Sequence, residues 1–266
     1  MKFALTTGGR IEAFPGGRGV CPSCRGEVIA KCGSHRIPHW AHRGIRDCDS
    51  WAEPETEWHR AWKNQFPVEF QEYVQHDEFG ERHIADVRTN HGLVLEFQHS
   101  HLNPQERAAR ERFYKNMLWI VDGTRLQRDY PRFLKGKDMF RPAGIPGYFL
   151  LPYPDEYLPK MWLDSSVPVI LDFRGIGTGD YTGQYQYRNL LWCLFPGRAE
   201  GMAVIVGMRP EQFVSVVPTR LQLIEVEQTL SNISQVLREQ RAQQEYQQLA
   251  RMRPGQALGR RRFPRF

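Results

Sequence analysis

The sequence from Ile84 to Gln98 reads IADVRTNHGLVLEFQ and is the most informative stretch of the chain. Apolar and β-branched residues alternate with other residues on both sides of an Asn-His-Gly turn signal at positions 90–92. This pattern predicts a β-hairpin with a three-residue loop, in which Gly92 takes the left-handed conformation that glycine adopts without strain. The hairpin is therefore the element from which the rest of the fold is built.

The register of this hairpin brings two carboxylates together. If Thr89 pairs with Leu93, Asp86 lies directly opposite Glu96, with the two Cβ atoms about 5 Å apart. Gln98 shares a face with Glu96, because side chains alternate along a strand. Two carboxylates on otherwise apolar strands repel each other unless a cation or a shared proton lies between them. A hard cation such as Mg²⁺, with oxygen ligands at about 2.0–2.1 Å, fits that gap. The alternative is an ordinary pair of acids on the wet face of a surface hairpin.

The residues before the hairpin predict a helix that begins at the acids and proline of positions 53–57. Two sets of residues recur every four positions, an apolar stripe and a polar stripe: Trp58, Trp62, Phe66 and Glu55, His59, Lys63. We expect Glu55 and His59 to face the hairpin carboxylates, with Glu57 in place of Glu55 if the helix is rotated. The alternative is a surface helix with Glu–His–Lys pairs.

The residues after the hairpin predict a second helix and a buried strand. Asn103 is a good N-cap with Pro104 in the first helical position, and the helix is expected to run to about Asn116. The apolar run from Met117 to Gly123 is typical of a fully buried strand. Strand, helix and strand form a βαβ crossover. The region thus predicts an α/β fold with the element order of a restriction-endonuclease-like core.

The cysteines predict a metal site in the N-terminal region. Four of the five cysteines lie in the first fifty residues, together with three histidines, which favours a metal over disulfides. The Cys-Pro-x-Cys knuckle presents two thiolates to one ion, and structural zinc takes four nitrogen or sulfur ligands. The expected ligands are Cys21, Cys24, His42 and Cys48. His39 or Cys32 are the substitutes, and His39 otherwise hydrogen-bonds a backbone group.

Several of these motifs together resemble the competence protein CoiA family over roughly residues 15–125. The matching segments are Cys21–Cys24, Pro38–His42, Glu55–His59 with Lys63, Ala85–Val87, Glu96–Ser100 and Met117–Gly123. The resemblance implies a zinc-ribbon-like module followed by a PD-(D/E)XK-type nuclease domain. It also implies that Asp86 and Glu96 are metal-binding acids, that Glu55 is the helix acid, and that Gln98 occupies the place usually held by lysine.

The activity expected from this resemblance is hydrolysis of DNA phosphodiester bonds with Mg²⁺ or Mn²⁺. An endonuclease is favoured over an exonuclease. Gln98 cannot carry the positive charge of a lysine but can hydrogen-bond water or phosphate. The missing cation would come from Lys63 or His59. Two other functions remain open: a non-catalytic nucleic-acid-binding or recombination factor on the same fold, and a nuclease effector that needs a partner protein.

Composition and charge set the remaining expectations. The 266-residue chain is 41% hydrophobic and 25% charged, without an apolar run of membrane-spanning length, and its start is too short and polar for a signal peptide, so a cytoplasmic protein is expected. The whole net charge of +6 lies in residues 251–266, which hold six arginines and no acid. Such a basic tail is typical of a segment that binds a polyanion such as DNA. The alternative is a solvated, disordered end that keeps the protein soluble.

The second half of the chain predicts more strands and a long helix. Strands are expected in three apolar runs, at 167–173, 189–195 and 202–207. A narrow apolar seam with 3–4 spacing is formed by Leu223, Val226, Leu230, Ile233 and Leu237. This seam packs on its own domain or binds a partner protein or a second copy. The expected units are a zinc module (1–52), a nuclease domain (53–150), a β-rich extension (151–220), an amphipathic helix (221–250) and a disordered basic tail (251–266).

Overall fold

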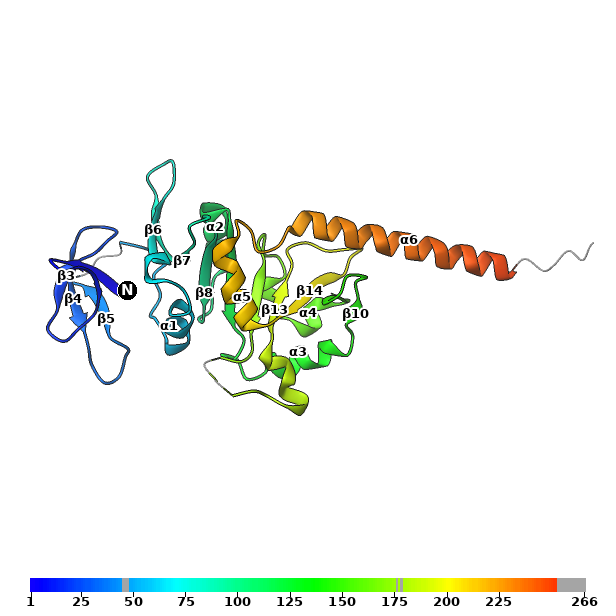
Figure 1. Cartoon of the computed structure of the whole chain (residues 1–266), viewed down its shortest axis with the longest axis horizontal. Helices are drawn as coiled ribbons and strands as arrows, with labels where there is room; N and C mark the ends of the chain where they lie inside the picture. Colours follow the sequence, from blue (N-terminus) through cyan, green and yellow to red (C-terminus); the bar gives the residue numbers. More distant parts are fainter. Residues whose placement is uncertain (45–47, 176, 178, 253–266) are drawn as a thin grey trace, which may run out of the picture.

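The chain forms two β-sheets, with helices packed on the larger one (Figure 1). This computed structural model describes residues 1–44, 48–175, 177 and 179–252. The small sheet lies at one end of an elongated molecule, and a long helix projects from the other end (Figure 1). Among the described residues, no helix is both long enough and apolar enough to cross a membrane.

The small sheet is antiparallel and has the strand order β2-β1-β3-β4-β5. Its strands are β1 (Phe3–Thr6), β2 (Gly9–Glu12), β3 (Arg18–Val20), β4 (Glu27–Lys31) and β5 (His39–His42). Among the described residues, its core is a cluster of four buried apolar residues: Ala4, Cys21, Val28 and Trp40. So small a core gives little stability by itself, and segments of this size usually need a metal or disulfides to fold. We refer to residues 1–48 as the N-terminal module.

The large sheet has nine strands in the order β10-β11-β14-β13-β12-β9-β8-β7-β6. The strands are β6 (Gln71–His76), β7 (Arg82–Arg88), β8 (Val94–Gln98), β9 (Met117–Asp122), β10 (Arg141–Pro142), β11 (Tyr148–Leu151), β12 (Val169–Asp172), β13 (Leu191–Leu194) and β14 (Ala203–Met208). β12 pairs in parallel with β9, with Ile170 opposite Ile120. The boundary expected at residue 150 therefore does not divide the sheet, because the later strands extend the earlier ones.

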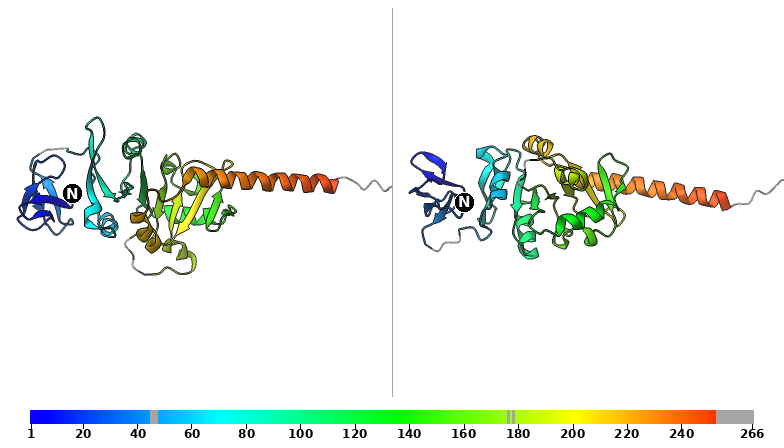
Figure 2. Two further views of the ribbon diagram at one scale, coloured as in Figure 1. Left: turned by 45° about the horizontal axis from the view of Figure 1, so that its top comes forward. Right: turned by 90° about the horizontal axis from the view of Figure 1, so that it is seen from below.

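Helices cover both faces of the large sheet (Figure 2). They are α1 (Glu57–Lys63), α2 (Pro104–Tyr114), α3 (Asp129–Lys137), α4 (Pro154–Tyr157), α5 (Pro210–Val216) and α6 (Val226–Met252), with 3-10 turns at Val68–Phe70, Lys160–Trp162, Gly183–Asn189 and Val217–Thr219. One core joins the sheet to α1, α5 and α6 through residues such as Trp62, Phe213 and Ile233. The other joins it to α2 and α3 through residues such as Tyr114 and Phe133.

The hairpin of β7 and β8 has the predicted register. Val87 lies opposite Leu95, the Thr89 N–H donates to the Leu93 carbonyl at 2.9 Å, and Gly92 has φ +82°. Glycine is suited to this position because a Cβ would be strained at that backbone angle. The register prediction is therefore confirmed as far as Val87 and Leu95, where the backbone pairing of the two strands ends.

The first helix begins later than expected. Its N-cap is Thr56, whose side chain accepts a hydrogen bond from the His59 N–H, and α1 starts at Glu57. A threonine hydroxyl satisfies one of the free N–H groups at a helix start, whereas the acids and proline at 53–55 offer no such cap here. Glu55 consequently lies before the helix and does not belong to a helical stripe with His59 and Lys63.

The second helix and the following strand match the sequence prediction closely. Asn103 caps α2 by accepting a hydrogen bond from the Gln105 N–H, and Pro104 is the first helical residue. The helix ends at Tyr114, two residues before the predicted end, because Lys115 leaves the helical conformation with φ +59°. Every residue of β9 is buried, as expected of the apolar run.

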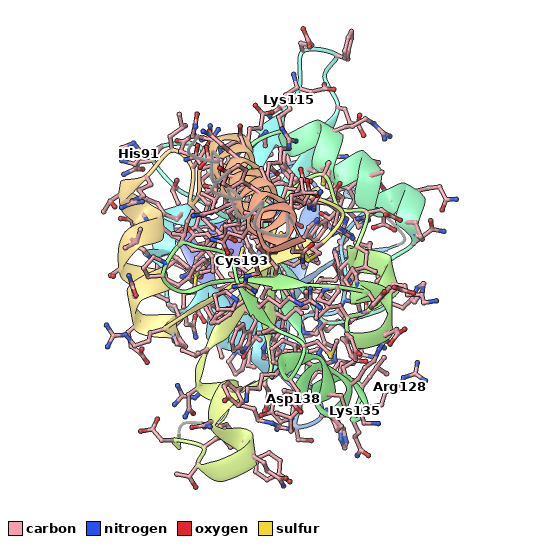
Figure 3. All side chains as sticks on the ribbon, turned by 90° about the vertical axis from the view of Figure 1, so that its right-hand side faces the viewer. His91, Lys115, Arg128, Lys135, Asp138 and Cys193 are labelled. Atoms are coloured by element: carbon pink, nitrogen blue, oxygen red, sulfur yellow. The ribbon has the colours of Figure 1, made fainter. Side chains whose placement is uncertain are left out.

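The long helix α6 is divided between a packed part and an exposed part. Ile233 is completely buried in the core, and Leu223, Val226, Leu230 and Leu237 pack against the same core. From Arg238 to Arg251 every side chain is exposed. Figure 3 shows the molecule from the end at which α6 projects, with α6 in front of the sheet that contains Cys193. The seam thus packs on its own domain, and residues 253–266 of the basic tail lie outside the described residues.

Candidate functional site

Asp86 and Glu96 lie where β7 and β8 separate. Backbone pairing between these strands stops at Val87 and Leu95, and side chains replace the next ladder bonds. The Asp86 N–H donates to Glu96 Oε1 at 3.2 Å, and the Phe97 N–H donates to Asp86 Oδ2 at 3.0 Å. The acids therefore hold the split open from within the sheet, and both line one cavity of about 90 Å³.

Opposite charges balance the two acids to different degrees. His59 Nε2 lies 2.8 Å and Lys63 Nζ 3.9 Å from Asp86 Oδ1. Burial by itself raises the pKa of Asp86, but His59 and Lys63 bring that pKa below its usual value. Burial and the neighbouring Asp86 raise the pKa of Glu96 to about 8, although Arg110 Nη1 lies 3.3 Å from its Oε2. The surroundings thus favour the charged form of Asp86 and the protonated form of Glu96.

His59 faces Asp86 without a normal hydrogen bond. Its Nε2 is buried and within ion-pair distance of Asp86, yet it makes no hydrogen bond of regular geometry. A ligand that enters the cavity and hydrogen-bonds this buried nitrogen would stabilise the protein. The cavity therefore presents two carboxylates and an imidazole nitrogen to any occupant.

Lys63 is the buried cation of the site. Its ammonium lies 2.8 Å from Glu55 Oε1 and 2.9 Å from Glu72 Oε1, and only 3% of its side chain is exposed. Burial by itself lowers the pKa of Lys63, but Glu72, Asp86 and Glu55 together raise it well above its usual value. Lys63 consequently stays charged and supplies a fixed positive charge beside Asp86.

Glu55 reaches the cavity but is already bound to cations. Besides Lys63, its carboxylate accepts two hydrogen bonds from the Arg60 guanidinium. These contacts outweigh burial and lower the pKa of Glu55. The alternative acid, Glu57, is exposed and does not line the cavity. The expectation that Glu55 faces the hairpin carboxylates is therefore met only in part, because its oxygens turn toward α1.

Gln98 shares the cavity with Glu96, and its amide is engaged. It is 2% exposed, and its Nε2 donates to Glu53 Oε1 at 2.8 Å and to the Ser100 carbonyl at 3.2 Å. Gln98 therefore holds Glu53 against the end of β8. Of the two groups proposed to replace the missing lysine, Lys63 carries a permanent charge and already contacts Asp86.

Four residues of the site were not predicted from the sequence. Glu53, Glu72 and Asp49 line the cavity, and Arg110 of α2 pairs with Glu96. Glu72 bonds the backbone N–H groups of Lys2 and Phe3, so it also joins the N-terminal module to the large sheet. No local pattern distinguishes these residues from surface charges, because each depends on partners far along the chain.

The expected zinc ligands form a cluster in the N-terminal module. The ligand atoms of Cys21, Cys24, His42 and Cys48 all lie within 4.8 Å of one another. Cys24 Sγ is 3.2 Å from His42 Nε2, and Cys21 Sγ is 3.8 Å from Cys48 Sγ. Sulfur atoms on a tetrahedral zinc ion with bonds of about 2.3 Å lie about 3.8 Å apart. The donor set and spacing therefore fit zinc.

The electrostatics of this cluster also favour a cation. Burial and the neighbouring thiols of Cys21 and Cys24 raise the pKa of Cys48 to about 12, because charged thiolates repel one another. A bound metal ion removes that penalty. His39 is not a member: its Nδ1 donates to the Ile37 carbonyl at 2.9 Å, as expected of a non-ligand. Cys32 also lies outside the cluster.

The fold and the two clusters define a mixed α/β protein with a metal-type Cys₃His module and a buried carboxylate site. Residues 17–50 match the model of the N-terminal domain of the competence protein CoiA. The competence protein CoiA of Bacillus subtilis is 27% identical over 129 residues, which is 44% of this chain and 34% of the relative. These matches show that part of the chain, including residues 17–50, is similar to CoiA. The alignment spans about a third of the relative, and no solved structure matches significantly.

Proposed function

We propose that this protein is a metal-dependent nuclease that hydrolyses DNA phosphodiester bonds. One observation carries the proposal: Asp86 and Glu96 face each other in a split strand pair and open into one cavity. Facing carboxylates that repel each other are suited to Mg²⁺ or Mn²⁺, which prefer oxygen ligands. When bound, such an ion polarises a phosphoryl oxygen and makes a bound water a better nucleophile.

The other side chains of the cavity support this assignment. His59 orients Asp86, and Lys63 provides the positive charge that lysine usually provides next to the second acid in PD-(D/E)XK enzymes. Such a charge stabilises the extra negative charge that develops on phosphate during hydrolysis. Gln98 holds Glu53, and Glu55 is neutralised by Arg60 and Lys63, so we place both outside direct metal binding.

The element order gives further support. α1, the strands β6 to β8, α2 and β9 follow one another in the order expected of a restriction-endonuclease-like core, with β8 and β9 parallel. The related protein is named as a competence protein, which accords with a role in DNA processing. The choice of DNA over RNA rests on this relationship and on the resemblance, since a pair of carboxylates does not distinguish the two.

The test is a cleavage assay on three substrates. Supercoiled plasmid, linear duplex and single-stranded DNA are incubated with the full chain in Mg²⁺, in Mn²⁺ and in chelator. We expect cleavage only with a divalent ion. Asp86→Asn and Glu96→Gln should each lower the rate about 100-fold or more, because each removes a charged ligand worth several kcal/mol in the transition state.

Glu78→Gln is the matched control, since it makes the same chemical change at an exposed turn. It should cut at the parental rate. DNA binding without cleavage by the parent would instead favour the non-catalytic binding factor, and cleavage that appears only on addition of a second protein would favour the effector. Full activity of both acid variants would refute the site assignment.

A further inference from the structure

The segment from Cys48 to Glu55, which we call the strap, joins the Cys/His cluster to the carboxylate cavity. Cys48 is a member of the cluster, and the cavity is lined by five of the next seven residues: Asp49, Trp51, Ala52, Glu53 and Glu55. The strap has no regular helix or strand, so its position depends on what its side chains bind. Its first residue, Cys48, belongs to the Cys/His cluster and packs against the small core of the N-terminal module.

Asp49 fastens the strap to β7. One carboxylate oxygen accepts a hydrogen bond from the Ile84 N–H at 2.8 Å, and the other accepts from His83 Nδ1 at 2.8 Å and from the Trp51 N–H at 3.0 Å. Only 5% of the Asp49 side chain is exposed. Ile84 lies two residues before Asp86, so Asp49 sets the path of the strand that carries the first acid.

Trp51 and Glu53 fasten the strap to the second acid. The Trp51 ring stacks on His83 with centroids 3.2 Å apart, and its carbonyl accepts a hydrogen bond from Arg110 Nη2 at 2.8 Å. The same guanidinium faces Glu96. Glu53 accepts from Gln98 on β8. The strap therefore contacts a neighbour of each acid, on both sides of the split.

We propose that Asp49 is a positioning residue that couples metal occupancy of the Cys/His cluster to the geometry of Asp86 and Glu96. Binding of zinc fixes Cys48, and the adjacent Asp49 then holds β7 at Ile84 in the position that the cation site needs. Partners that orient ligands without touching the metal commonly change metal affinity about 10–100-fold. The part of this inference that concerns the cation site rests on the proposed function.

The first measurement is hydrogen exchange at single amides, which needs no catalytic activity. The full chain is compared in zinc-loaded and zinc-free form, together with zinc-loaded Asp49→Ala. We expect the Ile84 amide to exchange about tenfold faster or more after either change, because its acceptor is lost or released. Amides of β12 and β13, in the middle of the large sheet, should exchange as before.

The second measurement is the affinity of the protein for Mn²⁺ without DNA, determined from the spectroscopic signal of the unbound ion. Mn²⁺ should bind about 10–100-fold more weakly to Asp49→Ala than to the parent. Removal of zinc should weaken Mn²⁺ binding to the parent by a similar factor. It should weaken Mn²⁺ binding to Asp49→Ala little further, since both changes break the same connection between the Cys/His cluster and β7. Asp49→Asn, which keeps one acceptor oxygen, should lie between the two.

Glu81→Ala is the matched control. Glu81 accepts a hydrogen bond from His83 Nε2 at 2.9 Å but is 57% exposed and contacts neither the strap nor Ile84. It should leave both measurements unchanged. If the Ile84 amide exchanged at the same rate in zinc-free and zinc-loaded protein, the inference would be overturned whether or not Mn²⁺ binds. Absence of Mn²⁺ binding in the parent would instead overturn the proposed function, and the exchange result would then decide the inference alone.

Discussion

At the residue scale, the two acids of the cavity carry different charges although they face each other. His59 and Lys63 keep Asp86 ionised, whereas Glu96 is buried next to that negative charge and has a pKa of about 8. A proton on Glu96 therefore removes the repulsion when no cation is present. Under the proposed function, a divalent ion would take the place of this proton, and its binding would then release the proton.

The raised pKa of Glu96 predicts a pH-dependent stability. Between pH 4.5, its ordinary value, and about pH 8, the folded state keeps a proton that the unfolded chain has released. The free energy of unfolding should therefore fall as the pH rises through this window, by on the order of a few kcal/mol. Urea unfolding in chelator at pH 5, 6.5 and 8 measures this slope.

Glu96→Gln is the control for this slope, because an amide cannot titrate. The variant should lose most of the decrease between pH 5 and 8, and Mg²⁺ should restore stability to the parent mainly at the upper end of the range. Asp86, with its lowered pKa, contributes stability that is lost only in more acidic solution. Equal slopes in the parent and in Glu96→Gln would contradict the prediction.

Lys63 gives a second prediction at this scale. Lys63→Met leaves Glu55 and Glu72 buried without their shared cation. Loss of one partner from a buried ion pair costs about 3–5 kcal/mol, so urea unfolding at pH 7 should show a decrease of that size. Lys135→Met, at an exposed position on α3 (Figure 3), should change stability by about 0.5 kcal/mol or less. A similarly small change at Lys63 would refute the proposed buried network.

At the element scale, the helix α6 and the β7–β8 hairpin illustrate how a regular element serves two purposes. The hairpin pairs normally near its turn and opens at the acids. The helix packs against the sheet over its first half and is exposed over its second half. In the hairpin, the part without backbone pairing carries the two acids of the cavity, and in the helix, the part without packing partners is exposed.

The division of α6 predicts two different responses to mutation. Ile233→Ala should lower the free energy of unfolding by about 2–5 kcal/mol, because Ile233 is fully buried against the sheet. Leu249→Ala should have almost no effect, since Leu249 is 64% exposed. Ending the chain after Glu239 should likewise leave the unfolding midpoint unchanged. A large loss of stability on truncation would mean that the exposed half has a partner in solution.

At the scale of the whole molecule, the N-terminal module and the large sheet differ in how they are held together. The large sheet has two extensive cores, whereas the described part of the module has one cluster of four buried apolar residues and the Cys/His cluster. Glu72 joins the two through the backbone of Lys2 and Phe3. A metal is therefore needed by the module far more than by the sheet.

This difference predicts the metal content and its effect. The purified chain should contain one zinc ion, measured by elemental analysis. Cys24→Ser should lose it, whereas Cys32→Ser, outside the cluster, should retain it. Zinc removal should make the module sensitive to proteolysis and leave the large sheet resistant. A metal-free protein whose module resists protease as well as the parent does would contradict the prediction.

Local pairing explains which parts of the site were predictable from the sequence. The turn at Gly92 sets the register that brings Asp86 next to Glu96, just beyond the last paired residues, and the knuckle of Cys21 and Cys24 sets half of the metal cluster. The helix start was predicted too early, because the acids and proline were weighed above the Thr56 cap. The extension after residue 150 was predicted as a separate unit, because its pairing with β9 involves strands far apart in sequence.

Short-range patterns were enough to predict the facing acids and the four clustered metal-type ligands, because turn geometry and ligand spacing act over short stretches of chain. The partners of those residues depend on how distant elements pack together. Arg110 beside Glu96, Glu72 beside Lys63, and Asp49 bound to Ile84 come from separate elements. Their charges look like surface charges in the sequence, and packing of the sheet, α1, α2 and the strap brings them into one buried site.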